Sequence, residues 1–112
     1  MIFIANVNAK IGRENDLLDW FDHVHTRDLL AIRGYVSVQR YELSPLQRRD
    51  MPPSPYSLLA IYEVEGQPDD LLADLAMARE AGRVRPTDTV LDSSLYLWVP
   101  STPRTESASI SK

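Results

Sequence analysis

The sequence predicts a single α+β domain whose elements follow in the order strand, helix, strand, strand, helix, strand. Short apolar runs rich in β-branched and aromatic residues mark the strands, and two longer stretches show helical periodicity. Proline and glycine stand where these stretches end. A chain of 112 residues with 44% hydrophobic and 25% charged residues has the composition of one globular domain with one core. We place this domain at residues 1–100 and expect a flexible tail at 101–112, which lacks apolar anchors.

The N-terminal part is predicted to form a strand, a helix and a second strand. Residues 2–7, IFIANV, are short, apolar and β-branched, which favours a buried strand. From Arg13 onward apolar residues recur at helical spacing, and Gly34 is a natural helix stop. Residues 35–43, YVSVQRYEL, then have the character of a strand.

The C-terminal part is predicted to add a strand, a helix and a last strand. Residues 56–64, YSLLAIYEV, form the third predicted strand, after a long loop at 44–55 that contains four prolines. A helix is expected between Pro68, which is followed by two aspartates, and Gly82. Residues 93–100 are expected to form the last strand.

This order of elements is that of the ferredoxin-like βαββαβ fold, an antiparallel sheet with two helices on one face. The third predicted strand is apolar on both faces, because neighbours such as Leu58 and Leu59 point to opposite sides. In the last predicted strand the neighbours Leu97 and Trp98 likewise point to opposite faces. A large exposed apolar face is rare on a monomer. We therefore expect a homodimer in which two sheets pack face to face.

Composition excludes several classes of partner and site. A net charge of −4 with scattered basic residues argues against a nucleic-acid groove or an anionic membrane surface. No apolar run is long enough to span a membrane, and residues 1–8 lack the features of a signal peptide. The absence of cysteine excludes disulfides and thiol chemistry and suits the cytoplasm, where we expect the protein. We expect no metal site and no bound cofactor, because zinc-site spacing, phosphate loops and dinucleotide fingerprints are all missing.

The segment HVHTRDLLAIRGYVSVQRYEL, residues 23–43, resembles the dimeric α+β barrel superfamily, and within it the EthD-like and methylmuconolactone-isomerase-like branch. Members carry a histidine near the end of the first helix, then a glycine and a strand of the RYE or KYE kind. His25, Gly34 and the RYE of residues 40–42 match this pattern. The resemblance covers about residues 1–100 and implies a dimeric barrel with a pocket between sheet and helices. The superfamily includes isomerases, polyketide cyclases, decarboxylases, cofactor-free monooxygenases, haem enzymes and proteins with no known reaction, so the fold does not settle the chemistry.

Helical geometry predicts that the two histidines face opposite ways. With Leu17 at zero, His25 falls at about 80° and Asp28 at about 20°, both inside the apolar arc, whereas His23 falls at about 240°. A histidine with an ordinary pKa near 6.5 can take or give a proton, and a carboxylate three residues away can hold its ring. The alternative is a structural, half-buried histidine bonded to Asp28 or to a backbone carbonyl.

Tyrosines and one asparagine are the other candidates. Tyr35 and Tyr41 are expected to share one face of the second strand, and Tyr56 and Tyr62 one face of the third. Tyrosine can donate a hydrogen bond to an enolate or phenolate oxygen while its ring stacks on a flat substrate. Core packing is the alternative for each aromatic residue. Asn6 can orient a carbonyl group, or bond within the strand end.

Taken together, these residues favour proton transfer in a small apolar pocket. The expected catalytic residues are His25, Asp28, Tyr41 and Tyr62. The expected substrate-binding residues are Asn6, Tyr35, Tyr56 and Trp98. With the resemblance, they predict a cofactor-independent enzyme of isomerase, cyclase, decarboxylase or monooxygenase type, acting on an aromatic, polyketide-like or lactone substrate. The alternatives are a non-catalytic small-ligand-binding or regulatory dimer, and a haem protein with His25 as axial ligand.

Overall fold

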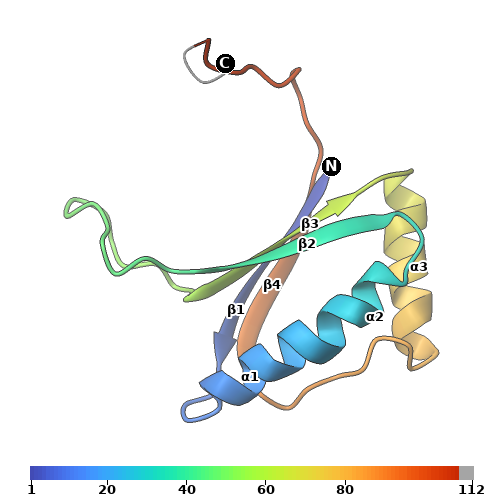
Figure 1. Ribbon diagram of the computed structural model, residues 1–112, viewed down its shortest axis with the longest axis horizontal. Coiled ribbons are helices and arrows are strands. Elements are labelled where there is room, and N and C mark those ends of the chain that lie inside the picture. Colours follow the sequence, from blue (N-terminus) through green and yellow to red (C-terminus); the bar gives the residue numbers. More distant parts are fainter. Residues whose placement is uncertain (109–112) are drawn as a thin grey trace.

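The computed structural model describes residues 1–108, which form a four-stranded antiparallel sheet with the helices on one face (Figure 1). The strands are β1 (Ile2–Ala9), β2 (Tyr35–Glu42), β3 (Leu58–Val64) and β4 (Val90–Trp98), in the order β2-β3-β1-β4 across the sheet. The first helical region comprises α1 (Glu14–Trp20), η1 (Phe21–His25) and α2 (Thr26–Leu30), and the second is α3 (Pro68–Glu80). The predicted α+β, ferredoxin-like order of elements is confirmed. None of the helices at 1–108 has the length and apolar character to span a membrane.

Two strands begin at other residues than predicted. Strand β4 begins at Val90, earlier than the expected start at Ser93. Residues 92–94 are polar and have low β-propensity, so the sequence does not predict this extension. They lie in the sheet because they pair with β1. Strand β3 begins at Leu58, so Tyr56, which was expected on this strand, precedes it.

The first helical region contains one turn of π-helix, η1, between α1 and α2. The backbone N–H of Thr26 donates to the Phe21 carbonyl five residues earlier, and the Thr26 hydroxyl donates to the same oxygen at 2.8 Å. A π turn holds more residues than an α turn and is often found at functional sites. Residues after Phe21 therefore depart from the 100° spacing of a regular helix, and His25 lies within the altered turn.

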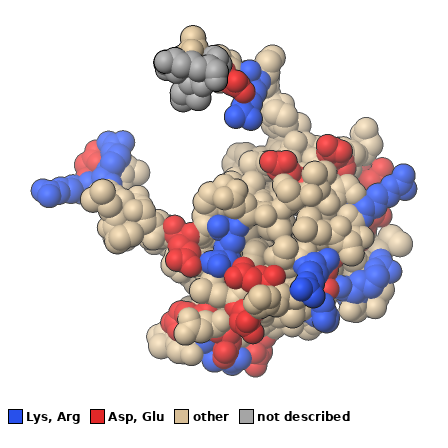
Figure 2. Space-filling model, in the orientation of Figure 1, with Lys and Arg blue, Asp and Glu red and all other residues tan. Residues whose placement is uncertain are grey.

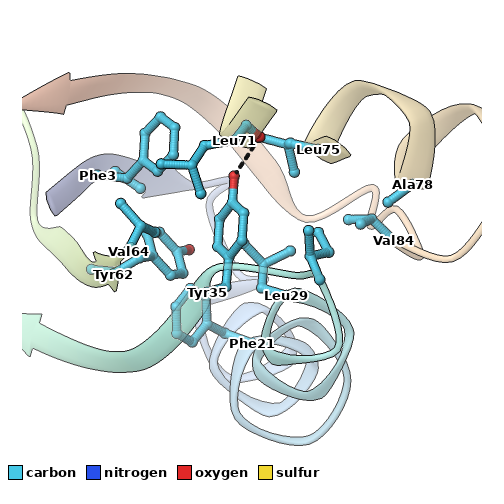
Figure 3. Close-up of a cluster of buried hydrophobic side chains, with 13 residues drawn as sticks. Phe3, Phe21, Leu29, Tyr35, Tyr62, Val64, Leu71, Leu75, Ala78 and Val84 are labelled. Carbon is cyan, nitrogen blue, oxygen red and sulfur yellow. Dashed lines mark hydrogen bonds between the residues drawn. The ribbon is translucent and has the colours of Figure 1, made fainter. Parts of the chain in front are cut away.

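The core lies between the helices and the covered face of the sheet. Figure 3 shows Tyr35 in the middle of this cluster, where its hydroxyl donates to the Leu71 carbonyl of α3 at 3.2 Å. The Tyr35 ring stacks on Phe3 of β1, with 5.9 Å between the ring centroids. This one side chain thus joins β2 to α3 and to β1.

Gly34 fixes how the first helical region enters β2. Its φ of +90° is left-handed, and an added Cβ would lie 2.5 Å from the Glu65 carbonyl oxygen and 2.7 Å from the Leu71 side chain. The Gly34 carbonyl in turn accepts a hydrogen bond from the Glu65 N–H at 2.8 Å. Only glycine meets both requirements, so Gly34 serves a close backbone contact in addition to the turn after the helix.

The sheet face that the helices leave uncovered carries many apolar side chains, with polar residues such as Asn6, Gln39 and Glu63 between them. The cross-strand register places on it one alternating set of residues from the four strands, among them Ile2, Ile4, Tyr41, Leu59, Ile61, Tyr96 and Trp98. We call this set the open face. Tyr96 and Trp98 are 64% and 57% exposed. The prediction that the third and last strands carry apolar residues on both sides of the sheet is thus confirmed by the side-chain register.

Two segments extend from the domain. The loop at 43–57 projects away from the sheet beyond β2 and β3 (Figure 1). Asn8 ties the base of this loop to β1, because its side chain donates to the Pro55 carbonyl at 2.7 Å and accepts from the Ser57 N–H at 3.1 Å. Residues 101–108 contain no helix or strand, and the remainder of the predicted tail, 109–112, lies outside the described residues.

Charged side chains of both signs are interspersed on the face seen in Figure 2, where basic side chains do not gather into one large patch. Exposed ion pairs of the described residues include Arg13 with Asp16 at 2.8 Å and Arg48 with Asp50. Exposed pairs of this kind contribute little to stability.

Candidate functional site

A cavity of about 160 Å³ lies between the covered face of the sheet and the helices. We call it the site cavity. Most of its wall is apolar and comes from β1, β3, β4, α1, η1 and α3, with Phe3, Leu17, Phe21, Ala60 and Leu75 among its residues. Its polar and charged lining residues are His25, Tyr35, Arg40, Tyr62, Arg79, Ser93 and Ser94. Among the described residues, no aspartate or glutamate lines it.

A wider hollow of about 620 Å³ adjoins the site cavity and shares Leu18 and Leu58 with it. It is an open depression at the ends of β1 and β2, and neither histidine nor tyrosine lines it. A ligand site is typically concave and mostly apolar with a few convergent polar groups. The site cavity fits that description better, although it is the smaller of the two.

His25 is positioned by the π turn and by two aromatic neighbours. Its Nε2 lies 3.2 Å from the Tyr62 hydroxyl, within hydrogen-bond distance. Its ring stacks on Trp20 at 4.5 Å between centroids and meets Phe21 at 5.3 Å. The end of α1 thus supplies Trp20, the π turn supplies Phe21 and His25, and β3 supplies the hydroxyl partner.

The buried surroundings keep both members of this pair uncharged. Burial, and to a lesser degree the positive charge of Arg79, lowers the pKa of His25 to about 4, against an opposing effect of Asp28. Burial raises the pKa of Tyr62 above its ordinary value. At neutral pH the pair is therefore a neutral imidazole beside a neutral phenol. Such a pair combines a phenol that can donate a proton with an imidazole nitrogen that can accept one, which is what proton transfer requires.

Two buried polar atoms beside the cavity have no hydrogen-bond partner among residues 1–108: His25 Nδ1 and Trp20 Nε1. If Nε2 accepts the Tyr62 hydrogen, Nδ1 carries the ring proton, and both unpaired atoms are donors. An unpaired buried polar group costs about 1–3 kcal/mol. Retaining two of them side by side is unusual for a site that only packs a core.

Asp28 does not form the predicted pair with His25. Both of its carboxylate oxygens are bound by Arg85, through the backbone N–H at 2.9 Å and the guanidinium at 2.8 and 3.1 Å. Hydrogen bonds from the Arg85 side chain and backbone lower the pKa of Asp28. No hydrogen bond joins Asp28 to His25, and Asp28 does not line the site cavity. The π turn explains the difference, because it rotates α2 relative to the regular helix that was expected.

Tyr41 lies on the open face and not with Tyr35, contrary to the prediction. The pairing of β2 with β3 shifts between Tyr35 and Ser37, which leaves Val36 as an extra residue. Such a bulge reverses the alternation of side chains along a strand. Tyr35 therefore faces the core and Tyr41 faces away from it.

Three predicted residues, Asn6, Tyr41 and Tyr56, gather in a second hollow of about 260 Å³ between the open face and the loop at 43–57. The Asn6 side-chain amide lies 3.4 Å from the Ser94 hydroxyl. The sheet separates this group from His25 and Tyr62. The structure thus divides the predicted site between two sides of the sheet.

Tyr35 lines the site cavity, but its hydroxyl already donates to the Leu71 carbonyl. Burial raises the pKa of Tyr35 to about 12, so it remains a phenol. Trp98 lies on the open face and lines none of the hollows described above. Among the eight predicted site residues, the geometry brings together His25 and Tyr62, with Tyr35 beside them as a packing residue.

Sequence reasoning missed three cavity residues: Trp20, Arg40 and Arg79. Arg40 is held by Asp22 through two bonds of 2.9 and 3.1 Å and by Glu42 at 3.0 Å. Strict alternation from Tyr35 places Arg40 on the outer face, so the bulge at Val36 hid its inward position from the sequence. Within 1–108, no group of three or more histidine, aspartate or glutamate side chains is placed to hold a metal ion.

No protein-family model matches the chain, and no curated protein is similar to it. Among solved structures, the chain is similar to the crystal structure of HapK from Hahella chejuensis, with a TM-score of 0.52 and 13% sequence identity. The match covers 95% of this chain and 100% of that chain. At this identity the likeness shows the fold alone.

Proposed function

We propose that the protein is a cofactor-independent small-molecule enzyme that uses acid/base chemistry in the site cavity. The observation that carries the proposal is the contact of 3.2 Å between His25 Nε2 and the Tyr62 hydroxyl in an apolar cavity wall. The substrate class that suits this cavity is a small aromatic, polyketide-like or lactone compound with an acidic C–H bond. The reaction is of isomerase, cyclase, decarboxylase or cofactor-free oxygenase type.

In this proposal His25 is the base and Tyr62 the hydrogen-bond donor. A carbonyl oxygen of the substrate takes the Tyr62 hydrogen bond, which frees the lone pair of His25 Nε2. The nitrogen then accepts a proton from the carbon beside the carbonyl, and the C–H electron pair moves to the oxygen as an enolate. The Tyr62 hydroxyl stabilises that charge, and return of the proton to another carbon completes an isomerisation.

The proposal includes membership of the EthD-like branch of the dimeric α+β barrels, on the histidine, glycine and RYE pattern at residues 25–42. It also includes a cytoplasmic location, which the lack of cysteine favours.

The proposed assembly is a homodimer formed by two open faces. Four strands about 4.8 Å apart and about 25 Å long give a footprint of roughly 500 Å². Side chains and the loop at 43–57 enlarge this toward the roughly 800 Å² that each partner of a stable pair buries. A second copy is the natural occupant, because one apolar patch serves both sides of a two-fold interface and sheets pack well on sheets.

Deuterium exchange into 2-indanone, a small aromatic ketone, tests the proposal without knowledge of the natural substrate. The measurement is loss of the proton NMR signal beside the carbonyl in D2O, with wild type and the His25→Gln and His23→Gln variants. His23 is the matched control because its side chain is 69% exposed. The proposal expects exchange above background in wild type and His23→Gln, and a loss of roughly 100-fold in His25→Gln.

The rival function is a non-catalytic ligand-binding or regulatory dimer. It predicts that 2-indanone quenches the fluorescence of Trp20 but exchanges no faster than in buffer. Equal exchange in the two histidine variants would remove His25 from the mechanism.

A further inference from the structure

Arg79 lines the site cavity from the last turn of α3. It lies one helical turn after Leu75, another cavity residue, so both side chains share the helix face that looks toward the sheet. Arg79 is exposed at the cavity edge. Within residues 1–108, neither a hydrogen bond nor an ion pair holds its side chain.

The other arginine of the cavity differs in this respect. Arg40 is bound by the carboxylates of Asp22 and Glu42, so its charge is already matched. Because no carboxylate among the described residues lines the cavity, Arg79 leaves it with an unmatched positive charge. This occurs in a chain whose net charge is −4.

The charge of Arg79 acts on the interior of the cavity. Burial is the main influence on the pKa of His25, Tyr35 and Tyr62, and the Arg79 charge acts on all three toward lower values. These residues belong to η1, β2 and β3. A charge affects three elements at once only when it lies close to all of them, since the interaction weakens with distance.

We infer that Arg79 binds an anionic group of the ligand, which makes the ligand of the site cavity a small aromatic carboxylate. The inference rests on the proposed function, because it assumes that the same cavity receives the substrate. It assigns Arg79 as a binding residue that the sequence pattern does not mark.

A carboxylate fits these surroundings better than a phosphate. The guanidinium is a planar fork that matches a carboxylate with two parallel hydrogen bonds. A phosphate needs more donors than one arginine, and the remaining wall is mainly apolar. The apolar wall and the Trp20 ring suit the aromatic part of the ligand, while its charged group stays at the exposed edge.

The structural alternative is that Arg79 only stabilises the end of α3, where a positive charge is favourable. Arg83 provides the matched control, because it lies just beyond the same helix end, is exposed, and does not line the cavity. An effect of charge on the helix end, or of net charge on any anion, would appear at both arginines.

Salicylate and salicylamide are a suitable pair of probes, since they share the ring and hydroxyl group and differ in charge. Isothermal titration calorimetry on the full chain would compare wild type with Arg79→Gln, Arg79→Lys and Arg83→Gln. We expect wild type to prefer salicylate, and Arg79→Gln to weaken salicylate by about tenfold or more with little change for salicylamide. Arg83→Gln is expected to bind both as wild type does, and Arg79→Lys to retain part of the preference.

Equal affinity of wild type for the two probes would overturn the inference, as would equal losses in Arg79→Gln and Arg83→Gln. If salicylamide binds and the preference is absent, Arg79 is not a carboxylate site while the cavity remains an aromatic site. If neither probe binds, the inference fails. If wild type also fails to exchange 2-indanone, the proposed function is contradicted too.

Discussion

His25 Nε2 and the Tyr62 hydroxyl lie 3.2 Å apart, although the two residues are separated by 37 positions in the chain. The π turn places the imidazole and β3 places the phenol, so neither element alone makes the pair. Both groups are buried and uncharged at neutral pH. The pair is therefore tied to the tertiary fold, and its ionisation influences stability as well as chemistry.

The pH dependence of stability reports the burial of His25. The unfolded chain binds a proton at this residue near its ordinary pKa of about 6.5, and the folded protein only near about 4. Between these values the unfolded state binds more protons, so stability is full above about pH 6.5 and falls as the pH drops toward 4. The loss is up to about 3 kcal/mol, measured by urea denaturation at a series of pH values.

The His25→Gln variant is the control for this effect. Its free energy of unfolding should change little between pH 6.5 and 4, whatever its absolute value. A wild type whose stability stays level over the same range would show that the imidazole is not buried as described.

Asp28 is expected to act in stability and not in catalysis. Asp28→Ala removes the acceptor of the Arg85 backbone N–H and of its guanidinium, and should cost about 1–3 kcal/mol. The 2-indanone exchange rate per folded molecule should stay within about twofold of wild type. Asp50→Ala, which breaks an exposed pair with Arg48, should have no measurable effect on stability. An Asp28→Ala variant that is as stable as wild type but inactive in exchange would contradict this prediction and show that Asp28 acts in catalysis.

Gly34→Ala should be strongly destabilising, by about 2 kcal/mol or more, because the added Cβ meets the Glu65 carbonyl oxygen at 2.5 Å. Gly12→Ala is the matched control. Its φ of +82° is similar, yet nothing lies within 4 Å of the added Cβ. Thermal unfolding of both variants separates the effect of the steric contact from that of backbone strain. Equal losses of stability in the two variants would mean that the close approach to Glu65 is unimportant.

The open face should control assembly. We expect wild type to sediment as a dimer at micromolar concentration, and Ile61→Glu to sediment as a folded monomer, since Ile61 is on an inner strand of that face. A carboxylate there would be buried against an apolar partner. Leu72→Glu, at an exposed position on α3, should remain dimeric. A monomeric wild type would show that another partner, or none, covers the open face.

The sequence was sufficient for the order of elements, because strand composition and helical spacing are local properties. It also placed His25 inward, and His25 does line the site cavity, although it lies within the π turn and not in the regular helix that ends at Trp20. Asp28 was misplaced because the whole π turn precedes it. Nothing in the composition of residues 21–25 distinguishes that turn from an α-helix.

The predicted position of Tyr41 was wrong for a similar reason, an irregularity in strand β2. The extra residue at Val36 reverses the faces of β2, and such a bulge depends on pairing with β3. The contact between Tyr62 and His25 and the position of Arg79 depend on how β3 and α3 pack beside the first helical region. Contacts between distant elements of this kind leave no mark in local sequence patterns.

The pH dependence of kcat/KM for 2-indanone exchange tests most directly whether His25 is the base. The account predicts a rate that rises as His25 loses its proton near pH 4, then levels off toward neutral pH. This inflection should persist in His23→Gln and disappear in His25→Gln. Superimposable profiles for wild type and His25→Gln, or an inflection that remains when His25 is replaced, would contradict the account.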